Sequence, residues 1–197
     1  MSTGPALGSD GVARCPWALS TPEYVAYHDL EWGRPVHGES ALFERLSLEA
    51  FQSGLSWLTI LRKREAFRSA FAGFDAEVVA GFGEADRERL LGDAGIVRNR
   101  AKIDATLANA AAVLRLRESV EGGLDALIWS FAEGSRPAPE TTAEVPPTTP
   151  ASVALAKTLK RHGFVFVGPT TAYAAMQACG LVDDHLAGCA ARGGGGA

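Results

Sequence analysis

Two pairs of metal-binding residue types lie at opposite ends of the sequence. Cys15 and His28 are near the start, and His185 and Cys189 are near the end, where the spacing H-x3-C can place both on one turn of backbone. Two thiolates and two imidazoles form the closed tetrahedral ligand set of a structural zinc site. Such an ion would join the two terminal segments. The alternative from these residues alone is a buried cysteine and two surface histidines.

Glu49 is a carboxylate within the apolar stripe of a predicted helix. Leu48 and Ala50 flank it, and Leu46 lies one turn away. A carboxylate is rarely buried unless it is paired, so this position requires a partner or a function. The functional interpretation is a carboxylate at the base of a pocket. The structural alternative is a salt bridge or a cap to a neighbouring turn.

Aromatic side chains are concentrated in the same part of the sequence as Glu49. Tyr24, Tyr27 and Trp32 precede it, and Trp57 follows it. Most aromatic stripes belong to a hydrophobic core. Beside a carboxylate, however, aromatic rings can also stack on a planar ligand such as a nucleobase.

The segment 93–98 (DAGIVR) connects two predicted helices and has the properties of a phosphate site. We expect Gly95 to adopt a left-handed backbone conformation there. Backbone N–H groups at the start of the following helix favour an anion. Basic residues form three clusters that are either solvated helix faces or DNA contacts. The clusters are Arg98, Arg100 and Lys102; Arg62, Lys63 and Arg64; and Lys157, Lys160 and Arg161.

The elements that must position these residues are helices, because apolar side chains recur at helical spacing along most of the chain. Thr21 with Pro22, Ser40 and Asp75 are predicted to begin three helices, and Gly180 is predicted to end the last one. The sequence therefore predicts an all-α protein. Its other predicted helices cover residues 57–71, 84–92, 99–118, 124–131, 152–162 and 171–179, with a long loop at 136–150.

The composition is typical of one globular domain. Of the 197 residues, 47% are hydrophobic and 21% are charged, and no apolar run is long enough for a membrane helix. Because the N-terminus has no secretory pattern, we expect a cytoplasmic protein whose three cysteines are core residues or metal ligands. The net charge of -4 argues mildly against nucleic acid, although phosphate binding depends on one face rather than on the total.

The domain organisation follows from the same patterns. We expect residues 1–13 and the Gly-rich residues 191–197 to be disordered tails. Between them, residues 14–190 are expected to form a single domain of two helical lobes with an active-site cleft between the lobes.

Together these segments resemble the 3-methyladenine DNA glycosylase I family, within the helix-hairpin-helix DNA glycosylases. The resemblance spans roughly residues 14–189, and it depends on five motifs in their order and spacing. The motifs are RCPW at 14–17, YHDLEWG at 27–33, LEAFQSGLSW at 48–57, DAGI at 93–96 and MQACGLVDDH at 176–185.

The resemblance implies a helix-hairpin-helix glycosylase fold in which a zinc site clasps the N- and C-terminal segments. It implies one structural zinc ion, with Cys15, His28, His185 and Cys189 as its ligands. Glu49 is implied as the catalytic carboxylate, which contacts the flipped base. The other implied residues are Tyr27, Trp32 and Trp57 in the base-binding pocket, Gln52 and Leu55 for insertion into the DNA gap, and Ala94, Gly95, Ile96 and Arg98 in the phosphate-binding hairpin.

The implied activity is base-excision repair: hydrolysis of the N-glycosidic bond of N3-methyladenine in alkylated double-stranded DNA. Many glycosylases of this superfamily have an aspartate after the hairpin, but Asp104 follows it too soon to be assigned that role. Two alternatives remain open. One is a zinc hydrolase that uses His28 and Glu31, and the other is a non-catalytic zinc-stabilised DNA-binding module. We expect a monomer with no obligate protein partner and no membrane contact.

Overall fold

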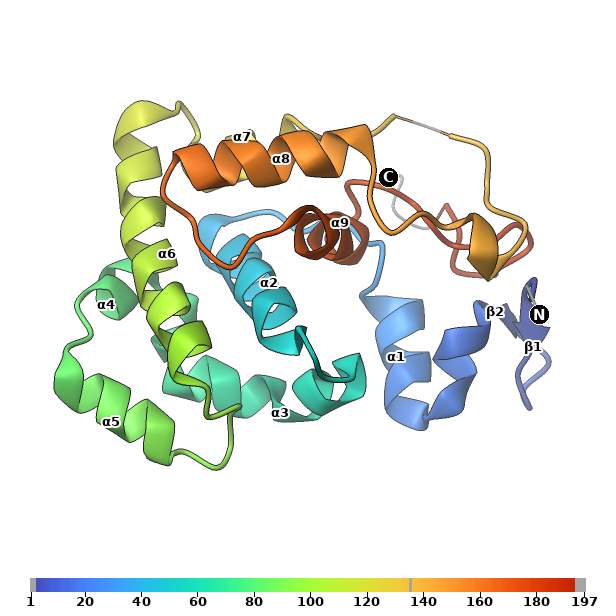
Figure 1. Ribbon diagram of the computed structural model, residues 1–197. Coiled ribbons are helices and arrows are strands. Elements are labelled where there is room, and N and C mark those ends of the chain that lie inside the picture. Colours follow the sequence, from blue (N-terminus) through green and yellow to red (C-terminus); the bar gives the residue numbers. More distant parts are fainter. Residues whose placement is uncertain (1–2, 135, 194–197) are drawn as a thin grey trace.

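The computed structural model describes residues 3–134 and 136–193. Within these ranges the chain is mostly helical, as the sequence predicts, and its one sheet is a pair of two-residue strands (Figure 1). The elements are, in order, β1 (Ala6–Leu7), β2 (Ala13–Arg14), η1 (Pro16–Ser20), α1 (Pro22–Leu30), α2 (Glu39–Gln52), α3 (Trp57–Ala70), η2 (Ala72–Phe74), α4 (Ala76–Ala80), α5 (Glu84–Gly92), α6 (Arg100–Ser119), α7 (Gly123–Trp129), η3 (Thr142–Glu144), α8 (Pro150–Arg161) and α9 (Pro169–Ala178).

Most helices begin at a side chain that caps them. Thr21 and Asn99 each accept a hydrogen bond from a backbone N–H three residues later, which fixes the starts of α1 and α6. Helix α2 differs from the prediction, because it begins two residues earlier than a cap at Ser40 allows. Its N-cap is Gly38, whose φ is 91° and whose N–H donates to the carboxylate of Asp125 in α7.

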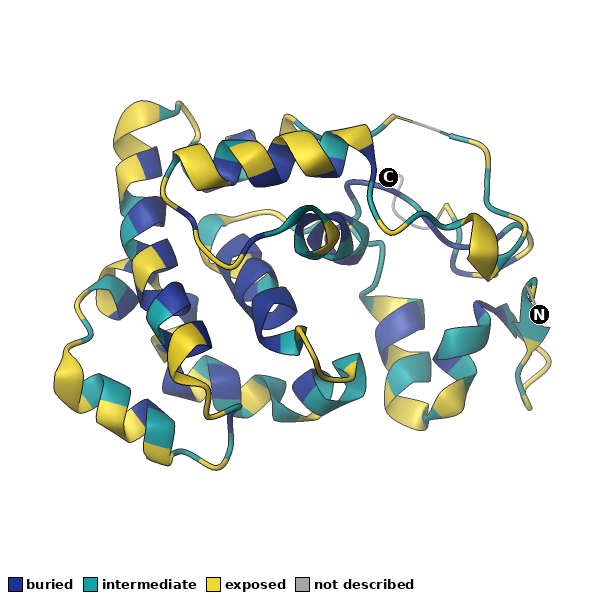
Figure 2. Ribbon diagram, in the orientation of Figure 1, coloured by how far each residue is buried: buried dark blue, intermediate teal, exposed yellow. Residues whose placement is uncertain are grey.

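Helix α2 is the centre of the fold. It packs against α3, α6, α7 and α9, and most of its length is buried (Figures 1 and 2). Leu42, Phe43, Leu48 and Phe51 each expose 1% or less of their surface. A helix that is apolar around most of its circumference requires neighbours on all sides. A charged residue on α2 is therefore held away from water, and Glu49 is such a residue.

The N-terminal segment is ordered where the sequence analysis expects a disordered tail at 1–13. Strands β1 and β2 pair antiparallel, and the N–H of Ala190 donates to the carbonyl of Ala13 at 2.9 Å. The guanidinium of Arg14 is buried and donates to both Asp10 and Asp29. A buried charge requires such partners, so Arg14 holds the hairpin against α1. Residues 1–2 lie outside the described residues.

The C-terminal segment also differs from the expectation of a tail from 191 onward. Ala191 is buried, and Arg192 donates to the backbone carbonyls of Asp183 and His185. The N–H of Ala190 donates to the carbonyl of Ala13, so the C-terminal segment lies against the N-terminal hairpin. The expectation for residues 194–197 lies outside the described residues.

The long predicted loop at 136–150 is shorter at its end. It contains the single turn η3, and α8 begins at Pro150, capped by the hydroxyl of Thr149. In the ranges that the structure describes, no helix combines the length and the apolar character that crossing a membrane requires. The cytoplasmic location stays a prediction.

Gly180 ends α9 as predicted, and it does so where the chain has no room for a side chain. Its φ is 75°, and the N–H groups of Gly180 and Leu181 donate to the carbonyls of Gln177 and Met176. This pattern is a Schellman motif. A Cβ at position 180 would lie 2.7 Å from the backbone carbonyl carbon of Arg34. The close approach fixes α9 against the segment that follows α1.

We expect Gly180→Ala to lower the free energy of unfolding by about 3 kcal/mol or more, because it adds a backbone clash to left-handed strain. The matched control is Gly73→Ala, at φ 65° with no atom within 4 Å of the new Cβ. It should cost about 1–2 kcal/mol. Urea unfolding of both variants measures the difference, and equal losses would contradict this account of Gly180.

Candidate active site and metal centre

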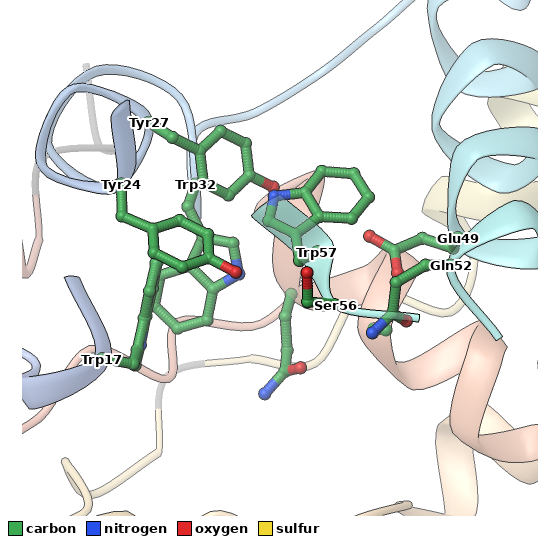
Figure 3. A pocket seen from close by; sticks show the side chains of 10 residues that line it. Trp17, Tyr24, Tyr27, Trp32, Glu49, Gln52, Ser56 and Trp57 are labelled. Carbon is green, nitrogen blue, oxygen red and sulfur yellow. The ribbon is translucent and has the colours of Figure 1, made fainter. Parts of the chain in front are cut away.

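A pocket of about 380 Å³ opens where α1, α2, α3 and α9 meet. Figure 3 shows that its walls are largely aromatic, with Glu49 on the side formed by α2. The volume and the apolar character suit a small planar ligand. The residues that line it are Trp17, Tyr24, Tyr27, Trp32, Glu49, Gln52, Ser56, Trp57, Ala174 and Gln177.

Glu49 is the carboxylate of this pocket and is only 7% exposed. Burial raises its pKa to about 8, and the positive charge of Arg45 opposes that rise. Within residues 3–134 and 136–193, no side chain or backbone group forms a hydrogen bond with the Glu49 carboxylate. Burial therefore favours the protonated form of Glu49 over the charged one.

Arg45 does not pair with Glu49, because another carboxylate holds it. Glu31 accepts a hydrogen bond from Arg45 at 3.2 Å and two from Arg64, at 2.5 and 2.9 Å. These bonds lower the pKa of Glu31, against the effect of its burial. Glu31 is thus a structural anion, which contradicts its role as the base of a zinc hydrolase.

The aromatic walls are held by ring contacts and one backbone bond. The rings of Tyr27 and Trp57 lie 5.5 Å apart between centroids, and those of Trp17 and Trp32 lie 5.2 Å apart. The hydroxyl of Tyr24 accepts a hydrogen bond at 2.8 Å from a backbone N–H in the first turn of α3. The walls from α1 and α3 are therefore fixed relative to each other without a ligand.

The loop between α2 and α3 borders the pocket. Gly54 has φ 81°, and the N–H of Leu55 donates to the carbonyl of Gln52 at 2.7 Å, which forms a tight turn. Gln52 lines the pocket, whereas the side chain of Leu55 is 40% exposed. The exposed Leu55 therefore lies in a loop in which Gln52 and Ser56 line the pocket.

The hairpin at 93–98 differs from the prediction in its backbone. Gly95 does not have a positive φ. Glycine is required instead because a Cβ would lie 2.9 Å from the Cβ of Ala66 in α3. The N–H of Gly95 donates to the carboxylate of Asp93 at 2.7 Å, and Lys63 Nζ donates to the carbonyls of Ala94 and Gly95. The hairpin is therefore packed tightly on α3.

Three residues from both ends of the chain form a cluster that can hold a metal ion. The ligand atoms of Cys15, His28 and Cys189 lie within 4.8 Å of one another, and all three residues are buried. His28 Nε2 is 3.4 Å from Cys189 Sγ, while its Nδ1 is 2.8 Å from Asp29. A carboxylate on Nδ1 orients an imidazole so that Nε2 can bind a metal.

His185 lies next to this cluster. Its ring centroid is 4.9 Å from that of His28, and its Nδ1 is 2.8 Å from Asp183. Its Nε2 is buried without a hydrogen-bond partner in the described part of the chain. An unpartnered buried nitrogen is costly. The rings of Trp17 and Trp32 pack against His28 and His185, respectively, so the cluster supports the pocket wall.

Comparisons with known proteins identify the family. A family model described as methyladenine glycosylase matches residues 17–192. The chain belongs to the methyladenine glycosylase family. The DNA-3-methyladenine glycosylase 1 of Escherichia coli K12 is 48% identical over 178 residues, which cover 89% of this chain and 95% of that protein. The resemblance that the sequence motifs indicate is therefore confirmed.

Solved structures of this family share the fold. A crystal structure of 3-methyladenine DNA glycosylase I has a TM-score of 0.85 and 47% identity, and it covers 90% of this chain and 98% of that chain. A structure that describes 3-methyladenine recognition by the Staphylococcus aureus enzyme has a TM-score of 0.85 and 35% identity, covering 91% of this chain and 96% of that chain.

The structure brings most of the sequence-predicted residues of this family member together. Tyr27, Trp32, Glu49 and Trp57 all line one pocket, whereas the hairpin at 93–98 does not. Four further residues line the pocket without a predicted role in it: Trp17, Ser56, Ala174 and Gln177. Trp17 and Gln177 lie within the motifs RCPW and MQACGLVDDH, so these motifs could have indicated that both residues line the pocket.

Some members of the basic clusters have partners within the protein. Arg62 pairs with Glu23, Arg64 pairs with Glu31, and Lys102 is buried. Lys157, Lys160 and Arg161 are exposed, so for this cluster both alternatives, a solvated helix face and a DNA contact, stay open.

The raised pKa of Glu49 predicts that the free energy of unfolding depends on pH. Its pKa is raised from the usual value near 4.5 to about 8 by folding, so its contribution to stability is full below the lower value and is lost as pH rises through the higher one. Relative to Glu49→Gln, the wild type should therefore lose about 1.4 kcal/mol for each pH unit between about 5 and 8. Urea unfolding of both proteins from pH 5 to 9 measures this. A difference that does not change with pH would show that Glu49 ionises normally.

Proposed function

We propose that this chain excises N3-methyladenine from alkylated double-stranded DNA and leaves an abasic site. The observation that carries the proposal is Glu49, a buried carboxylate that lines an aromatic pocket and has no ion-pair partner among the described residues. Its relatives support the substrate: the protein of Haemophilus influenzae that is 44% identical is a DNA-3-methyladenine glycosylase, and a neighbour with a TM-score of 0.85 was solved in complex with 3-methyladenine.

The pocket can receive a base only after the nucleotide leaves the duplex. A base inside the double helix cannot reach Glu49, so the nucleotide must be extruded. Methylation at N3 makes the adenine cationic. A cationic ring stacks well on electron-rich faces, and we assign this role to Tyr27, Trp32 and Trp57, at about 0.5–2 kcal/mol for each contact.

Glu49 selects the base by charge and by hydrogen bonding. A cation in the pocket favours the ionised form of Glu49 and so lowers its pKa from the raised value of the empty site. The carboxylate then accepts hydrogen bonds from the amino edge of adenine. Guanine has a carbonyl at the corresponding position, which would place one acceptor against another.

The reaction itself requires little acid catalysis, because the methylated base is already a good leaving group. Water adds to C1′ of the deoxyribose as the bond to the base breaks. The bonding electron pair neutralises the ring, and one water proton is released. Asp104 pairs with Arg87 at 2.9 Å and does not line the pocket. We therefore assign the acceleration to the instability of the lesion and to the pocket.

Two further segments are assigned to DNA. Leu55 and Gln52 are proposed to occupy the gap that the extruded nucleotide leaves, because Gln52 lines the pocket and the exposed Leu55 follows it in the same loop. The hairpin residues Ala94, Gly95 and Ile96 are proposed to lie against the phosphate backbone, with the exposed Arg98 as its cation. We retain the prediction of a monomer without an obligate partner.

We propose that the metal is one structural zinc ion held by Cys15, His28, His185 and Cys189. Two observations support the fit: three of these ligand groups already converge, and the Nε2 of His185 is buried and unpartnered. Zinc with four protein ligands supplies folding energy and has no open position for water. It would hold the two ends of the chain together behind the pocket.

The cysteines provide a matched test of the zinc site. Cys179 is also buried, but it lies outside the cluster, and burial raises its pKa to about 12. We expect Cys189→Ser to lose zinc and to melt at least about 10 °C lower, while Cys179→Ser keeps one zinc per chain. Metal analysis and thermal melting measure both effects.

The same two variants distinguish a structural from a catalytic ion. Zinc-free protein that is folded at low temperature should still release base. Loss of activity from a stable, folded, zinc-free protein would favour a zinc hydrolase instead.

The function is tested by base release from duplex DNA treated with a methylating agent. We expect selective release of 3-methyladenine over 7-methylguanine. Glu49→Ala should lower the rate by about 100-fold or more, and Glu49→Gln should also lower it because the negative charge is lost. Full activity of the glutamine variant would refute the role of the charge. Duplex binding without any release by the folded, zinc-loaded protein would favour the non-catalytic DNA-binding module.

A further inference from the structure

A buried lysine connects the helix after the hairpin to the loop beside the pocket. Lys102 lies in the first turn of α6 and is only 7% exposed. Its Nζ donates to the carbonyl oxygens of Phe51 and Ser53, at 2.9 and 2.6 Å. These carbonyls belong to the C-terminal end of α2 and to the residue that follows it.

Lys102 lies at the C-terminal end of α2, where the last backbone carbonyls need hydrogen-bond donors. The last carbonyls of a helix have no intrahelical partner, and they carry the negative end of the helix dipole. A buried ammonium satisfies them by charge and by hydrogen bonding. Because both contacts are within the protein, Lys102 is not a phosphate contact of the hairpin helix.

The turn that follows these carbonyls carries Leu55. Gly54 reverses the chain at φ 81°, and Gln52 and Leu55 exchange two hydrogen bonds, Leu55 N–H to Gln52 O and Gln52 Nε2 to Leu55 O. Lys102 therefore holds the base of the turn, while the side chain of Leu55 stays exposed.

We propose that Lys102 is a positioning residue for extrusion of the damaged nucleotide, because it fixes the turn of Leu55 relative to the hairpin. Helix α6 begins directly after the hairpin, where Asn99 caps it. Helix α6 thus connects the hairpin, which is assigned to the phosphates, with the turn of Leu55, which is assigned to the gap. The inference rests on the proposed insertion of Leu55. A preorganised turn avoids the entropy cost of ordering a loop during insertion.

Lys63 has the same bonding at the hairpin itself and provides a matched control. Its Nζ donates to the carbonyls of Ala94 and Gly95, at 2.7 and 3.2 Å. Both lysines hold backbone carbonyls of a DNA-facing segment, but only Lys102 contacts the turn of Leu55. A loss at Lys63 should therefore be independent of Leu55.

The test is a double-mutant cycle on the zinc-loaded protein. Lys102→Met, Leu55→Ala and their combination are compared in single-turnover release of 3-methyladenine from methylated duplex DNA, and in binding of free 3-methyladenine. We expect each single change to slow release by about 10- to 100-fold, with the double variant no slower than the slower single variant. Affinity for the free base should stay at the wild-type value throughout, because the free base needs no extrusion.

Several results would overturn the inference. Multiplying losses in the cycle would show that Lys102 acts independently of Leu55, and weaker binding of the free base would show a merely structural role. Lys63→Met with Leu55→Ala should give multiplying losses as the contrast. If Lys102→Met does not fold, Lys102→Gln, which keeps N–H donors, passes through the same cycle. Full activity of Leu55→Ala would instead refute the insertion role in the proposed function.

Discussion

The site depends on one constraint: Glu49 is buried on a central helix and forms no ion pair within residues 3–134 and 136–193. Helix α2 packs against α3, α6, α7 and α9, so Glu49 meets open space at the pocket. The guanidinium of Arg45, whose charge acts on Glu49, bonds instead to Glu31, which also accepts from Arg64. Burial therefore keeps the pKa of Glu49 raised, and a cationic ligand would lower it. Had Arg45 paired with Glu49, the charge would be neutralised before any base arrived.

The closure of the two termini supplies the opposite wall. Helix α1 carries Tyr24 and Tyr27, and it is tied to the C-terminal segment through the cluster of Cys15, His28 and Cys189. Arg14 adds a second tie through Asp29, which also orients His28. A metal at this cluster would stand behind the aromatic wall and outside the pocket. Such an ion would act on a ligand only through the position of the rings.

Much of this arrangement is readable from the sequence, and the failures have physical reasons. Helical periodicity and capping residues such as Thr21 and Asp75 predict most helices, because both are local properties. The order of the N-terminal segment depends on Arg14 meeting Asp29, a contact that no local pattern records. The need for glycine at 95 arises from Ala66 on another helix rather than from its own φ. The motifs predict that Tyr27 and Glu49 share one pocket. Which lysine and arginine side chains bond within the protein can be read only from the fold.

The positions of the lysine and arginine side chains explain how a chain with a net charge of -4 can still act on DNA. Lys63 and Lys102 direct their ammonium groups inward, to the carbonyls of the hairpin and of the turn after α2. Arg62 and Arg64 are paired with carboxylates. In the proposed function, these basic residues shape the segments assigned to DNA more than they supply charge to them. DNA recognition would then depend on the rigid placement of the hairpin and Leu55, with the exposed Arg98 as a cation for the phosphates.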